Sequence, residues 1–95
     1  MAYTLLKTVN AVGADEEIIV QTVCKSVAFV EDPSVAGWPT VDWLWRAPDS
    51  AEYATRTAGT SQLFTKPGGA WYMPGERVAY VKTATGSSSF QQVEQ

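Results

Sequence analysis

The chain has 95 residues, of which 45% are hydrophobic, 12% aromatic and 18% charged, and its formal net charge is −3. A chain of this length buries about two-thirds of the surface that it exposes when unfolded, and we expect one domain over residues 1–95. Its seven Lys and Arg residues are scattered singly, which argues against nucleic acid or an anionic membrane as a partner, because both are bound by clustered cations.

The N-terminal third of the chain predicts three strands. Residues 3–10 predict a strand or an extended N-terminal arm, because apolar residues share a parity there. Residues 16–31 are rich in Ile and Val and exceed the usual strand of about 5–6 residues, so we expect a break near residues 24–26. Their apolar spacing also fits a helix, but the β-branched content favours strands. A loop is expected over residues 31–39.

The strongest strand signal lies in residues 40–46. Val41, Trp43 and Trp45 share one face with a period of two residues, whereas polar side chains dominate the other face. Burying each of these large side chains contributes roughly 2–3 kcal/mol. The pattern therefore predicts the central strand of a two-layer β-domain, with these three residues on its inner face.

A β-hairpin is predicted over residues 52–66, with Ala58 and Gly59 at its tip. This register places Tyr53 opposite Phe64, and an aromatic cross-strand pair contributes about 0.5–1 kcal/mol. The turn signal itself is weaker than that of Asn-Gly, so the predicted pairing depends mainly on the match between the two strands.

The rest of the chain predicts extended segments separated by glycine turns. Residues 71–73 are a short extended piece, residues 77–83 a strand, and residues 88–94 the strand that returns beside it. Together with the segments above, they make seven or eight short strands at spacings near ten residues. This spacing predicts an all-β fold, a small antiparallel β-sandwich or barrel.

No residue pattern in the chain predicts catalysis, a cofactor or a metal site. The chain has no histidine to bind a metal or to activate the serines of residues 87–89. The acidic run at residues 15–17 lacks the spaced oxygen ligands of a calcium loop and is interpreted as a solvated turn. Cys24 is the only cysteine, which favours folding in a reducing cytoplasm, and we expect it to be buried. A non-enzymatic protein is therefore expected.

Aromatic residues are the candidates for a binding surface. Trp38 lies in the predicted loop, and Trp71 and Tyr72 are adjacent, so one of these two should face outward. Exposed aromatic side chains on a β-scaffold anchor protein interfaces or stack on sugar rings. The same side chains also suit the open ends of a core, and the sequence leaves these three interpretations open.

The supply of apolar residues predicts self-association. Neighbours such as Ile18 and Ile19 place apolar side chains on both faces of one strand, whereas a two-layer fold buries only one face. A contiguous apolar patch on the surface usually marks an interface, so we expect a homodimer or homotrimer. Residues 2–7, which include Tyr3 and Leu5, are expected to form an arm that lies across a neighbouring subunit.

The last third of the chain carries a resemblance to known proteins. Residues 67–81 read Pro-Gly-Gly-Ala-Trp-Tyr-Met-Pro-Gly-Glu-Arg-Val-Ala-Tyr-Val, and a Thr-Gly turn and a polar β return follow. This stretch resembles the closing strands of small capsid decoration or cement proteins of tailed bacteriophages. The resemblance implies a non-enzymatic virion structural protein, made in the host cytoplasm, that binds the major capsid protein or other virion proteins, often as a dimer or trimer. The aromatic residues support an alternative, a carbohydrate-binding β-sandwich module.

Overall fold

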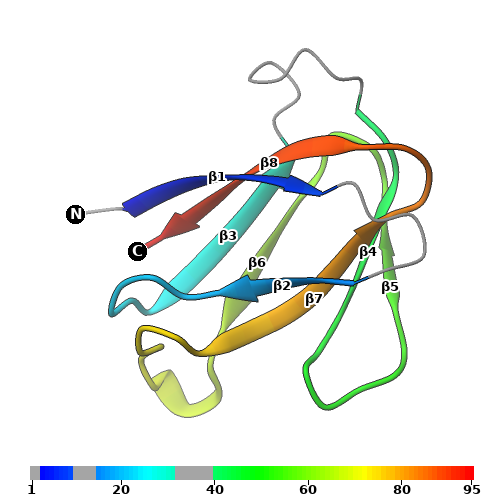
Figure 1. Ribbon diagram of the computed structural model, residues 1–95. Coiled ribbons are helices and arrows are strands. Elements are labelled where there is room, and N and C mark those ends of the chain that lie inside the picture. Colours follow the sequence, from blue (N-terminus) through cyan, green and yellow to red (C-terminus); the bar gives the residue numbers. More distant parts are fainter. Residues whose placement is uncertain (1–2, 10–14, 32–39) are drawn as a thin grey trace.

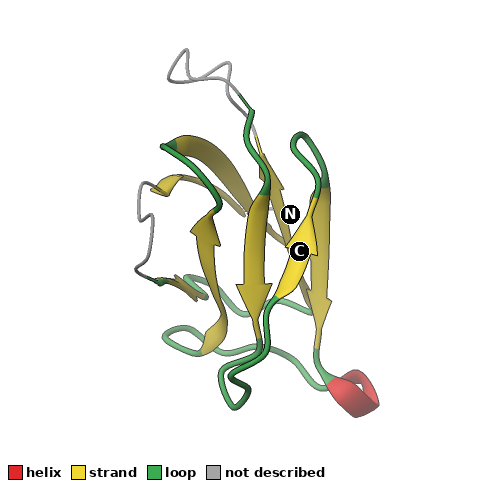
Figure 2. Ribbon diagram, turned by 90° about the vertical axis from the view of Figure 1, so that its right-hand side faces the viewer, coloured by secondary structure: helices red, strands yellow, loops and turns green. Residues whose placement is uncertain are grey.

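The computed structural model describes residues 3–9, 15–31 and 40–95, which form two facing four-stranded antiparallel sheets (Figure 1). One has the order β1–β8–β3–β6 and is named the 1-8-3-6 sheet, and the other has the order β2–β7–β4–β5 and is named the 2-7-4-5 sheet. The strands are β1 (Tyr3–Val9), β2 (Glu16–Ile19), β3 (Ser26–Glu31), β4 (Trp43–Arg46), β5 (Ala54–Arg56), β6 (Ser61–Thr65), β7 (Arg77–Thr83) and β8 (Ser88–Glu94). One 3-10 turn, η1 (Pro67–Gly69), is the only helical element in these ranges and lies at one end of the sandwich (Figure 2).

The chain crosses between the two sheets at almost every connection. Only β4 and β5 are consecutive strands that also pair with each other. The order 1-8-3-6 facing 2-7-4-5 is that of a jelly roll, a double-sheet sandwich of eight strands. The predicted small antiparallel β-sandwich is therefore confirmed.

The core is centred on Trp43, which is fully buried between the sheets. Its ring centroid lies 5.7 Å from that of Phe29 and 5.2 Å from that of Phe90, and the two phenylalanine rings stack at 4.6 Å. Trp45 packs against this core, with its ring 5.1 Å from that of Phe64. The predicted inner face of the tryptophan strand is thus confirmed for both tryptophans of β4.

The first three strands follow the sequence prediction with one difference. Residues 16–31 divide into β2 and β3, which lie in opposite sheets, so the predicted break is confirmed and the helix is excluded. β1 pairs with β8 along its whole length, beginning with Tyr3 opposite Glu94. In place of the expected arm across a neighbour, residues 3–9 form an edge strand of their own sheet.

The hairpin predicted over residues 52–66 is wrong, although its turn is present. The Thr60 N–H donates to the Thr57 carbonyl at 3.1 Å, but β5 pairs with β4 and β6 pairs with β3, in different sheets. Crossing to the other sheet buries Phe64 in the core, whereas Tyr53 stays 37% exposed. Burying a phenylalanine outweighs an exposed aromatic pair, which explains the crossing.

β8 has the predicted bounds but a different place in the fold. It lies between β1 and β3 and does not return beside β7. Its inward side carries Ser88, Phe90, Gln92 and Glu94, all buried, while Val93 is half-buried on the outer side. Phe90 is thus buried on the inner face and Val93 half-buried on the outer face without a bulge, and three of the four inward residues are polar.

Trp43→Ala should lower the free energy of unfolding by about 3–5 kcal/mol, because it leaves a cavity beside the stacked pair of Phe29 and Phe90. The matched control is Trp71→Ala, the same change at a side chain that is 50% exposed, which should cost less than about 1 kcal/mol. Urea denaturation measures both. Equal losses would show that Trp43 does not fill the space between the sheets.

Candidate partner-binding surface

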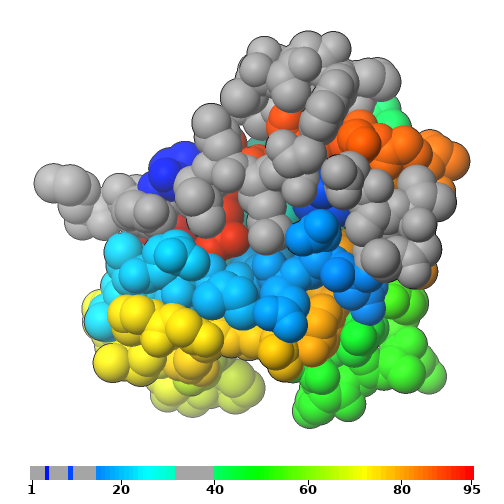
Figure 3. Space-filling model, viewed as in Figure 1, coloured from blue at the N-terminus to red at the C-terminus, as the bar shows by residue number. Residues whose placement is uncertain are grey.

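An exposed apolar surface lies where the β2–β3 connection meets the segment before β7. Cys24 and Tyr72 bridge the two segments: the Cys24 N–H donates to the Tyr72 carbonyl at 3.1 Å, and the Tyr72 N–H donates to the Cys24 carbonyl at 2.7 Å. Both side chains are buried, so their chain neighbours point outward. Val23, Trp71 and Met73 are accordingly 54%, 50% and 52% exposed. Figure 3 shows these segments side by side, in cyan and yellow.

Lys25 completes this surface, named here the end patch (Val23, Lys25, Trp71 and Met73). The antiparallel bridge sets Val23 opposite Met73 and Lys25 opposite Trp71. Lys25 Nζ lies over the Trp71 ring, 5.0 Å from its centroid, which is a cation–π contact. The half-exposed indole therefore belongs to a mixed surface that is apolar at one side and cationic at the other.

A tight turn holds the Met73 side of the end patch. Gly75 has a φ of 89°, as the second central residue of a Pro-Gly turn requires, and its N–H donates to the Val20 carbonyl at 2.8 Å. The Glu76 carboxylate accepts the Met73 N–H at 2.7 Å and pairs with Lys66 at 2.6 Å. The Lys66 contact and then the Met73 bond lower the pKa of Glu76, so the ionised carboxylate fixes this backbone.

A buried carboxylate holds the Val23 side. Glu94 is 1% exposed and accepts the N–H groups of Gln21 and Thr22 at 2.9 and 2.8 Å, and the Thr22 hydroxyl at 2.8 Å. The Gln92 side-chain amide donates to it at 2.7 Å. Burial alone raises the pKa of Glu94, but these donors outweigh burial and the pKa is lowered. Ionised Glu94 therefore fixes the two residues that precede Val23.

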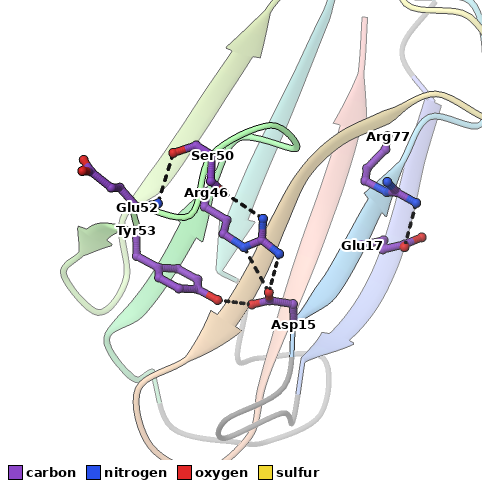
Figure 4. Close-up of polar contacts among 7 residues, drawn as sticks. All are labelled: Asp15, Glu17, Arg46, Ser50, Glu52, Tyr53 and Arg77. Atoms are coloured by element: carbon purple, nitrogen blue, oxygen red, sulfur yellow. Dashed lines mark hydrogen bonds and ion pairs between the residues drawn. The ribbon is translucent and has the colours of Figure 1, made fainter.

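The outer face of the 2-7-4-5 sheet carries a second cluster of charged and aromatic side chains, and Figure 4 shows its Asp15, Arg46 and Tyr53. Asp15 accepts hydrogen bonds from Arg46 at 2.9 Å and from the Tyr53 hydroxyl at 2.7 Å. The Arg46 guanidinium lies 4.0 Å from the Tyr80 ring centroid, and Lys82 Nζ lies 4.4 Å from that of Tyr53. Burial raises the pKa of Asp15, but the bonds from Tyr53 and Arg46 outweigh it and lower the pKa. We interpret this cluster as structural.

The acidic run at residues 15–17 is not the solvated turn that the sequence indicated. Glu16 and Glu17 lie in β2, and Glu17 forms an ion pair with Arg77 at 3.0 Å. Asp15 is partly buried in the cluster just described. Pairing with cations on neighbouring strands, which periodicity alone does not reveal, accounts for the difference.

The five residues predicted to bind a partner lie in different parts of the fold. Trp71 is in the end patch, whereas Tyr72 is 6% exposed and belongs to the core, so it offers no binding surface and that prediction is corrected. Tyr3 and Leu5 lie in β1, where their backbones pair with Glu94 and Gln92. Their side chains, and all of Trp38, lie outside the described part of the chain.

Sequence reasoning missed three members of the end patch: Val23, Lys25 and Met73. The signal that identifies them is alternation about Cys24 and Tyr72, since the neighbours of a buried bridge must face outward. That signal becomes readable only when the bridge is known, because the two segments are 48 positions apart in the sequence.

Two further features bear on function. Across the described residues, no group of three or more Cys, Asp or Glu side chains is arranged to hold a metal ion. No helix in this part of the chain is long and apolar enough to cross a membrane.

The chain matches no protein-family model, no curated protein and no solved structure. Function is therefore inferred from the chemistry of its own surface.

Glu94→Gln should lower the free energy of unfolding by about 2–3 kcal/mol at neutral pH, because an amide nitrogen faces donors that a carboxylate satisfied. The folded-state pKa of Glu94 lies below its ordinary value of 4.5. Its contribution to stability is therefore full above that value and is lost as the pH falls through the folded-state pKa.

Chemical denaturation between about pH 7 and pH 3 measures this dependence. The variant should lose less stability on acidification than the unaltered protein does. Glu52→Gln, at an exposed position, is the control and should match the unaltered protein. If Glu94→Gln showed the same loss on acidification as the unaltered protein, Glu94 would not be the ionised anchor of residues 21–22.

Proposed function

We propose that the chain is a non-enzymatic virion structural protein that decorates or cements a phage capsid, with the end patch as its contact with the major capsid protein. The observation that carries this proposal is the set of three half-exposed apolar side chains on one bridge, Val23, Trp71 and Met73. Grouped apolar side chains on a surface mark interaction sites. Tryptophan is also enriched among the residues that dominate interface energies.

The chemistry of the end patch suits a protein partner. Met73 has a flexible, polarisable side chain that adapts to irregular surfaces, and Val23 adds a rigid apolar neighbour. Lys25 occupies the space over one face of the Trp71 ring, so a sugar would have to displace it or use the other face. A protein partner, in contrast, can contact the ring and pair an acidic side chain with the ammonium group at once.

The sequence and the fold support the same proposal. Trp71 and Met73 lie within residues 67–81, the stretch that resembles capsid decoration proteins. The jelly-roll strand order is used by viral capsid domains and also by lectins. Because one fold serves many functions, the strand order is compatible with a capsid protein and with a lectin. The composition of the end patch favours binding to a capsid.

The half-exposed indole of Trp71 favours a second candidate, a carbohydrate-binding module. Stacking on a sugar requires a bare ring face, so Lys25→Ala should strengthen binding on a glycan array and Trp71→Ala should abolish it. If the end patch instead contacts a capsid, Lys25→Ala should weaken capsid binding or leave it unchanged. An array on which neither the unaltered chain nor Lys25→Ala binds would remove this candidate.

Trp71→Ala should weaken binding to capsids that lack the protein by about 10- to 100-fold, because it removes the largest exposed side chain of the end patch. Co-sedimentation of the purified chain with such capsids measures the affinity. Tyr53→Ala is the control: this ring is 37% exposed in the cluster on the outer face of the 2-7-4-5 sheet and is not part of the end patch, so its removal should leave the affinity unchanged.

Two results would contradict the proposal at different levels. Unchanged affinity of Trp71→Ala would show that the end patch is not the contact with the capsid. Absence of the chain from particles purified from the phage that encodes it, or a gene that lies in no phage genome, would overturn the virion function itself.

A further inference from the structure

The outer face of the 1-8-3-6 sheet carries no charged side chain among the residues that the structure describes. The outward positions of β3, β6 and β8 alternate with core residues such as Phe29 and Phe90, and they hold only Ser, Thr, Ala, Val, Leu and Gln. The outer side of the other sheet, by contrast, carries Glu17, Arg46 and Lys82. Roughly a quarter to a third of surface positions are ordinarily charged, so the neutral face is a distinct feature.

An apolar row crosses this neutral face. The register aligns Leu63 on β6 with Ala28 on β3, and Ala28 with Val93 on β8. Leu63 is 58% exposed, the highest value among the large apolar side chains of the described residues. Ala28 lies directly opposite Leu63 on β3, and Ser26 and Val30 are its diagonal neighbours there, and each of these side chains is shorter than that of Leu63. The neutral face thus combines one projecting side chain with a shallow surface beside it.

The edge of β6 is less suited to a partner than the face. The Ser61 carbonyl accepts a hydrogen bond from the Arg56 guanidinium at 2.7 Å, and the Leu63 carbonyl accepts one from the Gln62 amide at 3.2 Å. Addition of a strand requires edge carbonyls that can accept new bonds. Side chains already occupy these two, so docking through the face is favoured over docking through this edge.

We propose that the neutral face packs against the same face of a second copy about a two-fold axis. Each copy has a net charge of −3, so most ways of bringing two copies together oppose like charges, whereas this face opposes none. A two-fold contact is self-complementary, and Leu63 of each copy can meet the small side chains of the other. The contact surface of the expected dimer is therefore the neutral face, which is separate from the end patch.

The size of the neutral face sets the strength of this contact. The three strands whose outward side chains are described, β3, β6 and β8, have five to seven residues each and make a face of roughly 250–350 Å² per copy. Stable complexes bury about 800 Å² per partner. The dimer is therefore weak in free solution and populated only at high protein concentration. If the proposed function holds, copies held side by side on a capsid would associate more strongly, through effective concentration.

Sedimentation equilibrium between about 0.05 and 1 mM protein tests this contact. The average mass should rise with concentration from the monomer value of 10.3 kDa towards twice that value. Leu63→Asp should weaken association at least about tenfold, because each dimer would bury two carboxylates. The matched control is Val23→Asp in the end patch, at a side chain 54% exposed, which should leave association unchanged.

Amide NMR shifts of the unaltered chain provide a test that needs no substitution. Shifts of β3, β6 and β8 residues on the neutral face should move with concentration, while those of the end patch stay fixed. A constant mass over the whole range, or shifts confined to the end patch, would overturn the proposal. Capsid binding is scored separately: Leu63→Asp should still bind capsids, and Val23→Asp should still dimerise, so failure of one proposal is distinguished from failure of the other.

Discussion

The packing of Trp43 against Phe29 and Phe90 is the interaction on which the two sheets depend. The three rings come from β4, β3 and β8 and are all fully buried, so they join a central strand of one sheet to both central strands of the other. Their edge-to-face and stacked pairs add about 0.5–1.5 kcal/mol each to the burial itself. A chain that crosses between sheets at nearly every connection needs such a cluster, because few hairpins hold consecutive strands together.

Buried carboxylates fasten the connections that this crossing creates. Glu31, at the end of β3, accepts the Gly59 N–H at 2.7 Å, the Val41 N–H at 2.8 Å and the Ser88 hydroxyl at 2.6 Å, and so ties three separate segments together. Glu94, at the end of β8, does the same for residues 21–22. Charge-assisted bonds of this kind are stronger than neutral ones. The end patch is therefore carried on backbone that the core and Glu94 hold in place.

Strand positions could be predicted from this sequence, whereas strand partners could not. Period-two alternation identified the buried face of β4, and Gly and Pro identified the turns before β6 and β7, because both signals are local. Alternation shows which face of a strand is buried but not which strand lies beside it, so the predicted pair of Tyr53 with Phe64 placed two strands of different sheets together. Gln92 and Glu94 resemble a solvent face in sequence, since their hydrogen-bond partners come from distant positions: Gln92 donates to the Ile19 carbonyl, and Glu94 accepts the Gln21 N–H. For the same reason only Trp71 of the end patch could be predicted.

Interstrand NOE spectroscopy tests the central claim, that all consecutive strands except β4 and β5 lie in opposite sheets and thereby build both the end patch and the neutral face. The account predicts backbone contacts between Leu63 and Ala28 and between Leu44 and Thr55, together with contacts across the Cys24–Tyr72 bridge. Contacts between Tyr53 and Phe64, in the register of a simple hairpin, would contradict it, because β5 and β6 would then belong to one sheet.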